Sequence, residues 1–338
     1  MKIARIPLKQ YSRFHFGELK LDHDLALTDT SVYAHSDTLF SALVNAYSRI
    51  KEQADDFVDS FRTNQISISS LLLYAENKQS GNTVYFLPKP AFLAINIPKD
   101  KDRTHKKKNR IKFVSIGVWK NGFQTEHWFD ETQYQVLQDN TFVMTKSEFD
   151  ALDIDASTVL VRTTIRPKSP IRAEEDQAIY YQADIEIVGN ENTKIGWYFC
   201  YEAEGENELQ LKLATNVMAY TGIGGEIYNT GRTIASNPEF KNIPFEVPEG
   251  NHQYSNIGLL NPTKEEFTQV EYYSSTLRGG RLIGRSGTFA EVVRMIEEGA
   301  LLTSNEIKGR LVPLGEDEQE RTILRYGKPF IIPMPYDN

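Results

Sequence analysis

The chain has 338 residues, of which 40% are apolar, so it is long enough for one large or two medium-sized domains with real cores. Its formal net charge of −8 argues against a protein that coats nucleic acid non-specifically, although a local cationic groove stays possible. The single cysteine, Cys200, excludes a disulfide framework and a cysteine-based zinc site and is typical of a reducing cytoplasm. The start of the chain has no apolar signal region, and no apolar run of about 18 residues follows, so we expect neither secretion nor a membrane span.

The first part of the chain predicts strands with two helices near the start. Residues 2–14 look like a strand, and 36–52 has helical spacing, with Ser36 as a plausible N-cap and Asp37 favourable in the first turn. The expected apolar face of this helix consists of Leu39, Phe40, Leu43, Val44, Tyr47 and Ile50. The further elements expected, in chain order, are a short helix at 54–63 and strands at 66–75, 83–87, 111–119, 157–165, 178–188 and 195–203.

A helix predicted over 207–220 leads into an unusual segment, GIGGEIYNTGR at 222–232. Gly222 is suited to end the helix, whereas Gly224, Gly225 and Gly231 indicate a backbone that comes close either to another strand or to a ligand. The segment fits neither the P-loop nor the dinucleotide fingerprint, so we do not expect an ATP or NAD site. Two interpretations stay open, a structural turn and a loop whose amides face a sugar-phosphate chain beside a cation.

The final part predicts strands near 268–276, 281–284 and 322–333, while 288–302 fits either a helix or a hairpin. Strands and helices in this order predict an α+β fold with helices packed on one face of an antiparallel sheet. Two tandem ferredoxin-like domains would account for the pattern, the first over 1–205 and the second over 206–338.

Two segments carry concentrated charge. Residues 99–112 hold eight Lys or Arg against two Asp, which indicates either a solvated loop or an electrostatic attraction to phosphates. The segment RPKSPIRAEEDQ, at 166–177, contains two prolines and three cations between two predicted strands.

Several motifs in register resemble a known family. They are FHFG at 14–17, HSDTLFSALVNAY at 35–47, LPKP at 87–90 with the lysine-rich run after it, the glycine loop at 222–231, and, in the C-terminal half, YYSSTLRGGRL, RMIEEGALL and ILRYGKPFIIP. In order and spacing they resemble the Cas5-like RAMP subunit of type III-A CRISPR effectors, subunit four of the Csm complex. The resemblance covers nearly the whole chain.

The resemblance implies a non-catalytic, cytoplasmic ribonucleoprotein subunit with two RRM-like domains, no cofactor and no metal. Such a subunit holds the repeat-derived 5′ tag of the crRNA, contacts the large polymerase-palm subunit and starts the filament of RAMP backbone subunits, so that it meets target RNA only indirectly. The resemblance also favours a hairpin for 288–302. It further implies that 166–178 is a thumb β-hairpin that wedges into the guide, with Ile171 and Arg172 as its candidate tip.

Candidate RNA contacts combine aromatic rings that stack on bases, cations that meet phosphates and glycines that admit a backbone. They are Phe14, His15, Phe16, His35, Ser36, Lys106, Lys107, Lys108, Arg166, Lys168, Ile171, Arg172, Gly222, Gly224, Gly225, Tyr228, Arg232, Arg278, Arg281 and Arg285. Simpler roles compete with these. Phe14 and Phe16 share a strand face typical of a core, so we expect at most one of them to touch RNA. His35 is either a hydrogen bonder beside a helix start or a phosphate ligand.

Two alternatives come from other classes of protein. Related RAMP proteins include endoribonucleases that process repeat RNA without metal, using a histidine as general base, and His15 or His35 could be interpreted that way. The sequence offers no obvious partner acid for either histidine. A pure protein-interaction adaptor is the third possibility and would make the basic loops incidental.

Overall fold

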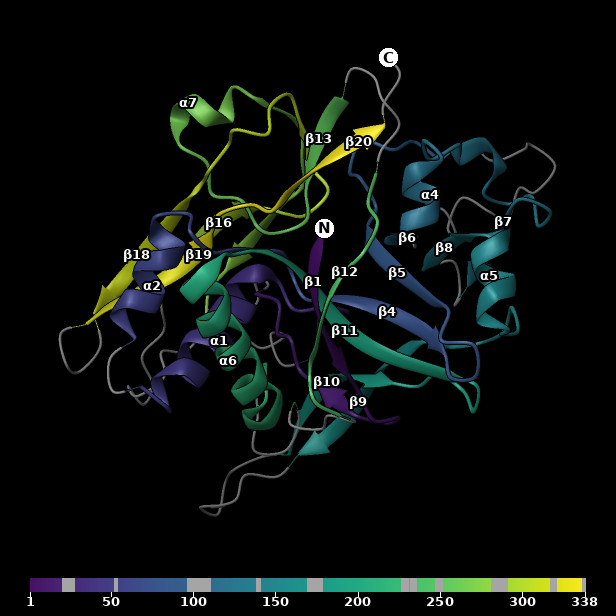
Figure 1. Ribbon diagram of the computed structural model, residues 1–338, viewed down its shortest axis with the longest axis horizontal. Coiled ribbons are helices and arrows are strands. Elements are labelled where there is room, and N and C mark those ends of the chain that lie inside the picture. Colours follow the sequence, from purple (N-terminus) through teal and green to yellow (C-terminus); the bar gives the residue numbers. More distant parts are fainter. Residues whose placement is uncertain are drawn as a thin grey trace.

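The structure is a computed structural model, shown in Figure 1. The residues it describes are 1–19, 28–51, 54–95, 111–137, 141–168, 179–225, 231, 236–246, 252–280, 291–316 and 321–335.

The first sheet contains a ferredoxin-like unit. Its four strands are β1 (Lys2–Pro7), β4 (Leu72–Asn77), β11 (Thr193–Glu202) and β12 (Glu239–Asn242). They stand in the order β12-β1-β11-β4 with every neighbouring pair antiparallel, which is the order 4-1-3-2 when they are numbered along the chain. Helix α1 (Ser36–Ser48) lies between the first two strands in sequence and α6 (Gly205–Thr221) between the last two, which completes a β-α-β-β-α-β unit.

A long insertion extends this sheet beyond β4. The added strands are β5 (Thr83–Pro88), β6 (Phe113–Ser115), β8 (Phe142–Thr145) and β7 (Tyr134–Leu137), in that spatial order, and β3 (Ser67–Ile68) pairs with β11. The β6–β8 pair is parallel. The accompanying helices are α2 (Asp55–Arg62), α4 (Ile116–Lys120), the 3-10 turn η3 (Thr125–His127) and α5 (Lys146–Leu152).

A separate three-stranded ribbon contains the predicted thumb arms. The strands β9 (Val161–Lys168) and β10 (Tyr180–Ile187) pair antiparallel, and β2 (Arg13–Phe14) pairs with the other edge of β10. The two strands predicted on either side of the thumb segment are therefore confirmed as the arms of one antiparallel ribbon. The proposed tip, Ile171 and Arg172, lies outside the described residues.

The C-terminal part repeats the same strand order with fewer helices. Its sheet contains β13 (His252–Asn256), β14 (Val270–Tyr272), β17 (Leu301–Leu302) and β20 (Ile331–Pro335). The order β20-β13-β17-β14 is again 4-1-3-2. A single-turn helix, α7 (Lys264–Phe267), follows the first strand, and the antiparallel ribbon of β18 (Arg310–Glu316) and β19 (Thr322–Gly327) occupies the place of the second helix. The predicted α+β fold with antiparallel sheets is confirmed.

Two expectations about elements need correction. The strand predicted at 111–119 ends at Ser115, because the Ser115 hydroxyl accepts a hydrogen bond from Val118 N and starts α4. The segment 288–302 is extended in its described part, but β16 (Val293–Ile296) pairs with β15 (Ser275–Arg278) and not with β17, so it is not a hairpin of its own two strands.

The expected domain boundary after residue 205 also differs from the structure. Helix α6 and strand β12 belong to the first sheet, since β12 pairs with β1 and α6 packs beside α1. Figure 1 shows α1 and α6 together on one side of β1 and β11. The first unit therefore includes residues that the sequence analysis gave to the second.

The first sheet is buried on both faces, because successive side chains along its strands point alternately to one face and to the other. In β1, Ala4 and Ile6 pack with the helices, whereas Ile3 packs with Phe330 and Ile332 of the second unit. In α1 the predicted face is largely confirmed, with buried side chains at Leu39, Phe40, Leu43 and Tyr47. Val44 is only partly buried, and Ile50 lies beyond the end of α1 and is exposed.

The Phe40 ring stacks on Tyr326 of β19, with ring centroids 5.3 Å apart, and lies edge-on to Phe61 at 5.1 Å. Aromatic packing therefore joins the two units. Burying each such side chain contributes roughly 1.5–3 kcal/mol. Among the described helices there is none whose length and apolar character would let it cross a membrane.

Candidate nucleic-acid interface

Three segments that are distant in sequence meet in one run of backbone pairing. On one edge of β2, Phe14 and Arg13 pair with Ile185 and Glu186 of β10. Beyond the other edge lies the glycine loop, where Gly225 N donates to His15 O at 2.9 Å and Gly231 N donates to Arg13 O at 2.7 Å. The glycine loop, the FHFG segment and the thumb arms are therefore one continuous structure, which we call the ribbon interface.

The glycines of this loop have a structural explanation. Gly222 N donates to Met218 O, and with a φ of +99° Gly222 ends α6, as predicted. Gly224 has a φ of +96°, and a Cβ there would lie 2.5 Å from His15 O. Gly231 has a φ of +78°, and its Cβ would meet the Ile223 carbonyl. Close approach to the chain's own backbone thus requires glycine at both positions.

Gly225 differs from its neighbours. It is exposed, its φ is not positive, and a Cβ would touch only the edge of the His15 ring, 3.0 Å from Cδ2. Of the glycines described in the loop, this is the exposed one.

The thumb arms have two chemically different faces. Odd-numbered residues share one face, on which Val161, Ile185 and Ile187 are buried in the core. Farther along the same face, Ile165, Ile179 and Tyr181 are each more than half exposed. The ribbon therefore carries an apolar and aromatic surface out of the core.

Ion pairs cover the opposite face of the arms. Arg166 Nε donates to Asp184 Oδ2 at 3.0 Å, and Arg162 Nε and Arg13 Nε donate to the two oxygens of Glu186 at 2.9 and 2.5 Å. Burial alone would raise the pKa of Glu186, but the bonds from Arg162 and Arg13 hold it below its usual value. The predicted phosphate ligand Arg166 is therefore already paired with a buried carboxylate, and Lys168 ends the same strand.

The aromatic and histidine side chains of FHFG point into the protein. Phe14 and Phe16 are buried, and each ring lies edge-on to Trp197, with centroid distances of 5.6 and 5.9 Å. His15 is buried as well, with Nδ1 2.6 Å from Ala183 O. Neither Phe ring has a free face for stacking, which agrees with the expectation that at most one of them touches RNA and with their simpler role in the core. The buried His15 side chain contacts the backbone of β10.

A second group of candidates lies in a buried cluster at the start of α1. We call it the polar joint, and its members are Tyr33, His35, Asp37, Ser70, Arg278, Glu298 and Arg325. His35 Nδ1 lies 2.9 Å from a Glu298 oxygen, and Tyr33 Oη donates to the same carboxylate at 2.9 Å. Burial alone would lower the pKa of His35, but the Glu298 carboxylate raises it above the usual value.

His35 is a hydrogen bonder beside the start of α1, the first of its two expected roles. It precedes α1 as the N-cap residue without a side-chain capping bond, and its ring is turned inward to Glu298. Ser36 is the first helical residue and not the N-cap. Its amide donates to Ser70 Oγ at 2.8 Å, and its hydroxyl accepts from Leu259 N at 2.9 Å. Sequence analysis missed Glu298 because the two partners are 263 positions apart.

The structure also corrects the role expected of Arg278 as an RNA contact. Its Nε and Nη2 donate to the two oxygens of Asp37 at 2.9 Å each, and Arg325 Nη1 donates to Asp37 at 2.8 Å. Burial alone would raise the pKa of Asp37, yet the two arginines hold it well below its usual range. A buried, bidentate arginine cannot also be a solvated phosphate ligand, so Arg278 joins the two units.

The remaining candidates lie outside the described residues. They are Lys106, Lys107, Lys108, Ile171, Arg172, Tyr228, Arg232, Arg281 and Arg285. In the part of the chain that is described, no group of three or more His, Cys, Asp or Glu side chains could hold a metal ion.

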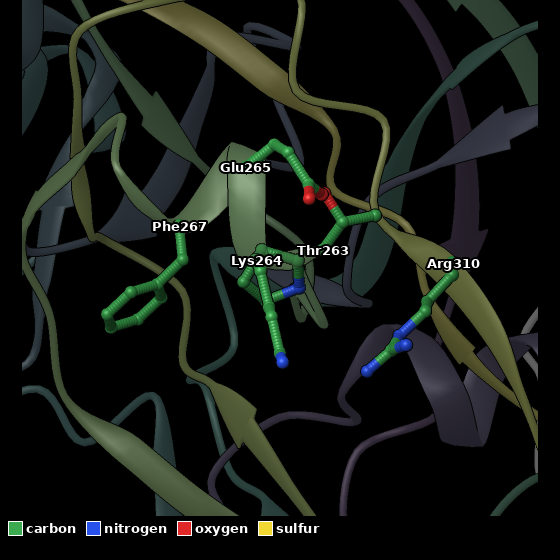
Figure 2. A pocket seen from close by; sticks show the side chains of 6 residues that line it. Thr263, Lys264, Glu265, Phe267 and Arg310 are labelled. Carbon is green, nitrogen blue, oxygen red and sulfur yellow. The ribbon is translucent and has the colours of Figure 1, made fainter.

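A pocket that the sequence analysis missed opens on the C-terminal unit, with a volume of about 560 Å³. Its lining consists of Pro262, Thr263, Lys264, Glu265, Phe267 and Arg310. Figure 2 shows Lys264 and Arg310 extending to the same side of α7. Thr263 and Glu266 form a capping box at the start of α7, and Arg310 Nε donates to Asn261 at 2.6 Å, so part of the lining supports the local fold. The ribbon interface contributes no residue to this pocket.

Comparisons with known proteins agree with the geometry. Residues 249–334 match the CRISPR Csm4 C-terminal domain. A Csm4 protein of Methanocaldococcus jannaschii is 24% identical over 316 residues, which cover 83% of this chain and 79% of that protein. The crystal structure of a Csm3-Csm4 subcomplex of the type III-A CRISPR-Cas interference complex has a TM-score of 0.69, with 21% identity and full coverage of both chains. A Csm1-Csm4 cassette in complex with cA4 has a TM-score of 0.58, with 18% identity and full coverage.

The chain shares the fold of the matched chains in these complexes along its whole length. Its C-terminal region carries the Csm4 C-terminal domain, and the resemblance to the Csm4 subunits that the sequence motifs indicated is confirmed.

Proposed function

We propose that this chain is a non-catalytic crRNA-binding subunit of a type III CRISPR interference complex and that it holds the repeat-derived 5′ tag. The observation that carries the proposal is the ribbon interface, in which the glycine loop, FHFG and the thumb arms form one paired structure. An RNA strand laid along it would meet the exposed Gly225 and the apolar face at Ile165 and Tyr181. Single-stranded RNA is recognised through such combinations of backbone approach and base stacking.

The chemistry of the arms defines how this contact would work. Because Arg162 and Arg166 are paired with buried carboxylates, the described arms offer apolar surface more than positive charge. Phosphate attraction would then come from the basic run at 99–112 and from Arg232. The arms would separate or stack bases, while the cationic segments would supply salt-dependent affinity.

The partners follow from the solved complexes of similar proteins. These contain Csm1 or Csm3 together with Csm4. We infer that this chain likewise joins a large polymerase-palm subunit and a filament-forming RAMP backbone subunit, in the cytoplasm. Target RNA would be reached only through the guide.

The alternative, a repeat-processing endoribonuclease, receives little support. Sequence analysis found no partner acid, and the structure supplies one for His35 in Glu298. Both side chains are buried, and the His15 ring is also inside the protein. A general base must reach the ribose 2′-OH, so neither histidine is placed for that reaction.

The proposal is tested with purified protein and labelled RNA. Tagged crRNA should bind more tightly than an RNA with a scrambled tag and should stay intact with or without divalent metal. The double variant Ile165→Ser/Tyr181→Ser should lose the preference for the tag, while the exposed pair Phe267→Ser/Tyr272→Ser, on the second unit, serves as the matched control. Equal loss in both variants, or repeat cleavage that His35→Ala abolishes, would contradict the proposal.

A further inference from the structure

Helix α6 exposes three large apolar side chains on the face opposite its buried one. One face packs in the core through Leu211, Ala214 and Met218. On the other, Leu209, Leu213 and Tyr220 are 61%, 40% and 62% exposed. Their spacing of four and seven residues aligns these three side chains, and at about 100° per residue the row lies opposite the buried face. A helix that only covers a sheet places polar residues there, so this outer row requires a further explanation.

Charge around the row limits what can cover it. Glu206 is exposed on the same face, about one turn before Leu209, and Glu204 and Glu202 are exposed next to the start of the helix. Helix α2 lies beside α6, because Ser60 Oγ donates to Asn207 Oδ1 at 2.9 Å, and it exposes Asp55 and Asp56 in its first turn. An acidic rim of this kind repels RNA and a second copy of the same surface alike.

Nearby cations do not cancel this rim. Lys2 and Lys212 both bond to Glu208, each at 2.8 Å, and hold its pKa at about 2. Glu202, Glu204 and Glu206 form no ion pair with a described residue. The row is therefore an apolar surface with net negative charge at one end.

We propose that Glu206, Leu209, Leu213 and Tyr220, here called the α6 stripe, dock a protein subunit of the same complex whose contact surface is an apolar ridge with Lys or Arg beside it. The partner is sought within the complex, so the inference rests on the proposed function. The stripe is separate from the ribbon interface, since it shares no residue with β2, β9 or β10.

The stripe also lies next to the glycine loop in sequence and in space. Tyr220 comes two residues before Gly222, and Tyr220 Oη donates to Asn237 Oδ1 at 2.5 Å. Asn237 lies on the far side of the loop in sequence. A partner that covers Tyr220 would fix the residues on both flanks of the loop, and this couples docking to RNA affinity: the assembled chain binds the tag more tightly than the free chain.

The test uses the full chain, a purified large subunit, a purified backbone subunit and tagged crRNA. Leu209→Glu/Leu213→Glu should reduce affinity for one of the two subunits by roughly tenfold or more, as truncation of a buried apolar contact does. Phe267→Glu/Tyr272→Glu, with comparably exposed side chains on the second unit, should keep wild-type affinity. Glu204→Lys/Glu206→Lys should slow association with the same subunit and reduce its salt dependence. Unchanged thermal unfolding verifies the fold of each variant.

Other outcomes overturn the inference. If the stripe variant binds both subunits as the wild type does, the surface is not a docking site. If instead it loses crRNA affinity as the free chain, the stripe contacts RNA. If wild type is a dimer in light scattering and the variant a monomer, a second copy covers it. A wild type that binds tagged crRNA but neither subunit refutes the stripe alone, whereas one that binds neither RNA nor subunits refutes the proposed function too.

Discussion

The ribbon interface and the polar joint contain the same kinds of candidate residue, but they differ in the surface that they expose. Both supplied histidines and arginines that the sequence analysis placed on RNA. In the ribbon interface an apolar face at Ile165 and Tyr181 extends into solvent, and Gly225 is exposed. In the polar joint His35 and Arg278 are buried and paired with the buried carboxylates of Glu298 and Asp37. Residue type alone therefore does not identify a binding site, since burial and the existing partners decide which side chains are available.

The largest expected effect comes from breaking the polar joint. Asp37→Ala would leave Arg278 and Arg325 buried without their carboxylate, and removing one partner of a buried pair costs roughly 3–5 kcal/mol. Urea unfolding should show this loss. Asp59→Ala breaks the exposed pair with Arg62 and should cost less than about 1 kcal/mol, so it is the matched control. If Asp37→Ala kept full stability and lost RNA binding, the joint would be a ligand site after all.

The second largest effect is expected in the glycine loop. Gly224→Ala adds a clash with His15 O to an unfavourable φ and should destabilise by more than the roughly 1–3 kcal/mol of the φ alone. Gly81→Ala is the control, because Gly81 has a φ of +75° and open space around it. Chemical unfolding of both variants separates the clash from the strain. Equal losses in the two variants would mean that close approach to β2 contributes nothing.

Gly225→Ala completes this series with a binding measurement. It needs only a small shift of the His15 ring, so we expect nearly unchanged stability and weaker binding of the tag. Unfolding and RNA titration on the same preparation measure both quantities. Wild-type RNA affinity in a folded Gly225→Ala protein would exclude Gly225 from the interface.

The pH dependence of stability reports on the joint independently. The folded pKa of His35 is raised from 6.5, so its contribution is complete below that value and is lost as the pH rises through the folded pKa. The folded pKa of Glu298 is lowered from 4.5, so its contribution is present above that value and is lost as the pH falls through the folded pKa. The unfolding free energy should therefore decrease toward alkaline pH in wild type and less in His35→Gln. Parallel profiles would contradict the pairing.

The basic run should give the smallest effect. Replacing Lys106, Lys107 and Lys108 by Gln should weaken binding of unrelated RNAs to a similar extent. The slope of log affinity against log salt concentration should become shallower by about 0.7 for each phosphate that is no longer neutralised. Titrations at several salt concentrations measure the slope. No change in slope would assign the run to solvent or to a protein partner.

Local signals accounted for much of the fold. Spacing predicted α1 and α6, and the glycine at 222 correctly marked the end of α6. Two helices were missed although their capping boxes are readable, with Thr145 and Glu148 at α5 and Thr263 and Glu266 at α7. These signals lie within four residues and needed no tertiary information.

Long-range contacts explain what was missed at the site. The pairing of His35 with Glu298 and of Asp37 with Arg278 depends on how β15 and the turn after β16 pack against α1. The substitution of a ribbon, β18–β19, for the second helix of the C-terminal unit likewise depends on packing against α1, through Tyr326. No local pattern encodes these contacts. Sequence analysis succeeded where the backbone sets the role of a residue, as it does for Gly222 at the end of α6.

Photocrosslinking tests the ribbon interface most directly. A crRNA with 4-thiouridine at successive tag positions is assembled with the chain and its two partner subunits, irradiated and mapped by peptide mass spectrometry. The account predicts crosslinks from neighbouring tag positions to peptides containing Tyr181 and to the peptide containing Gly225. Crosslinks from the tag only to the partner subunits, or only to α6 and α7 of this chain, would contradict it.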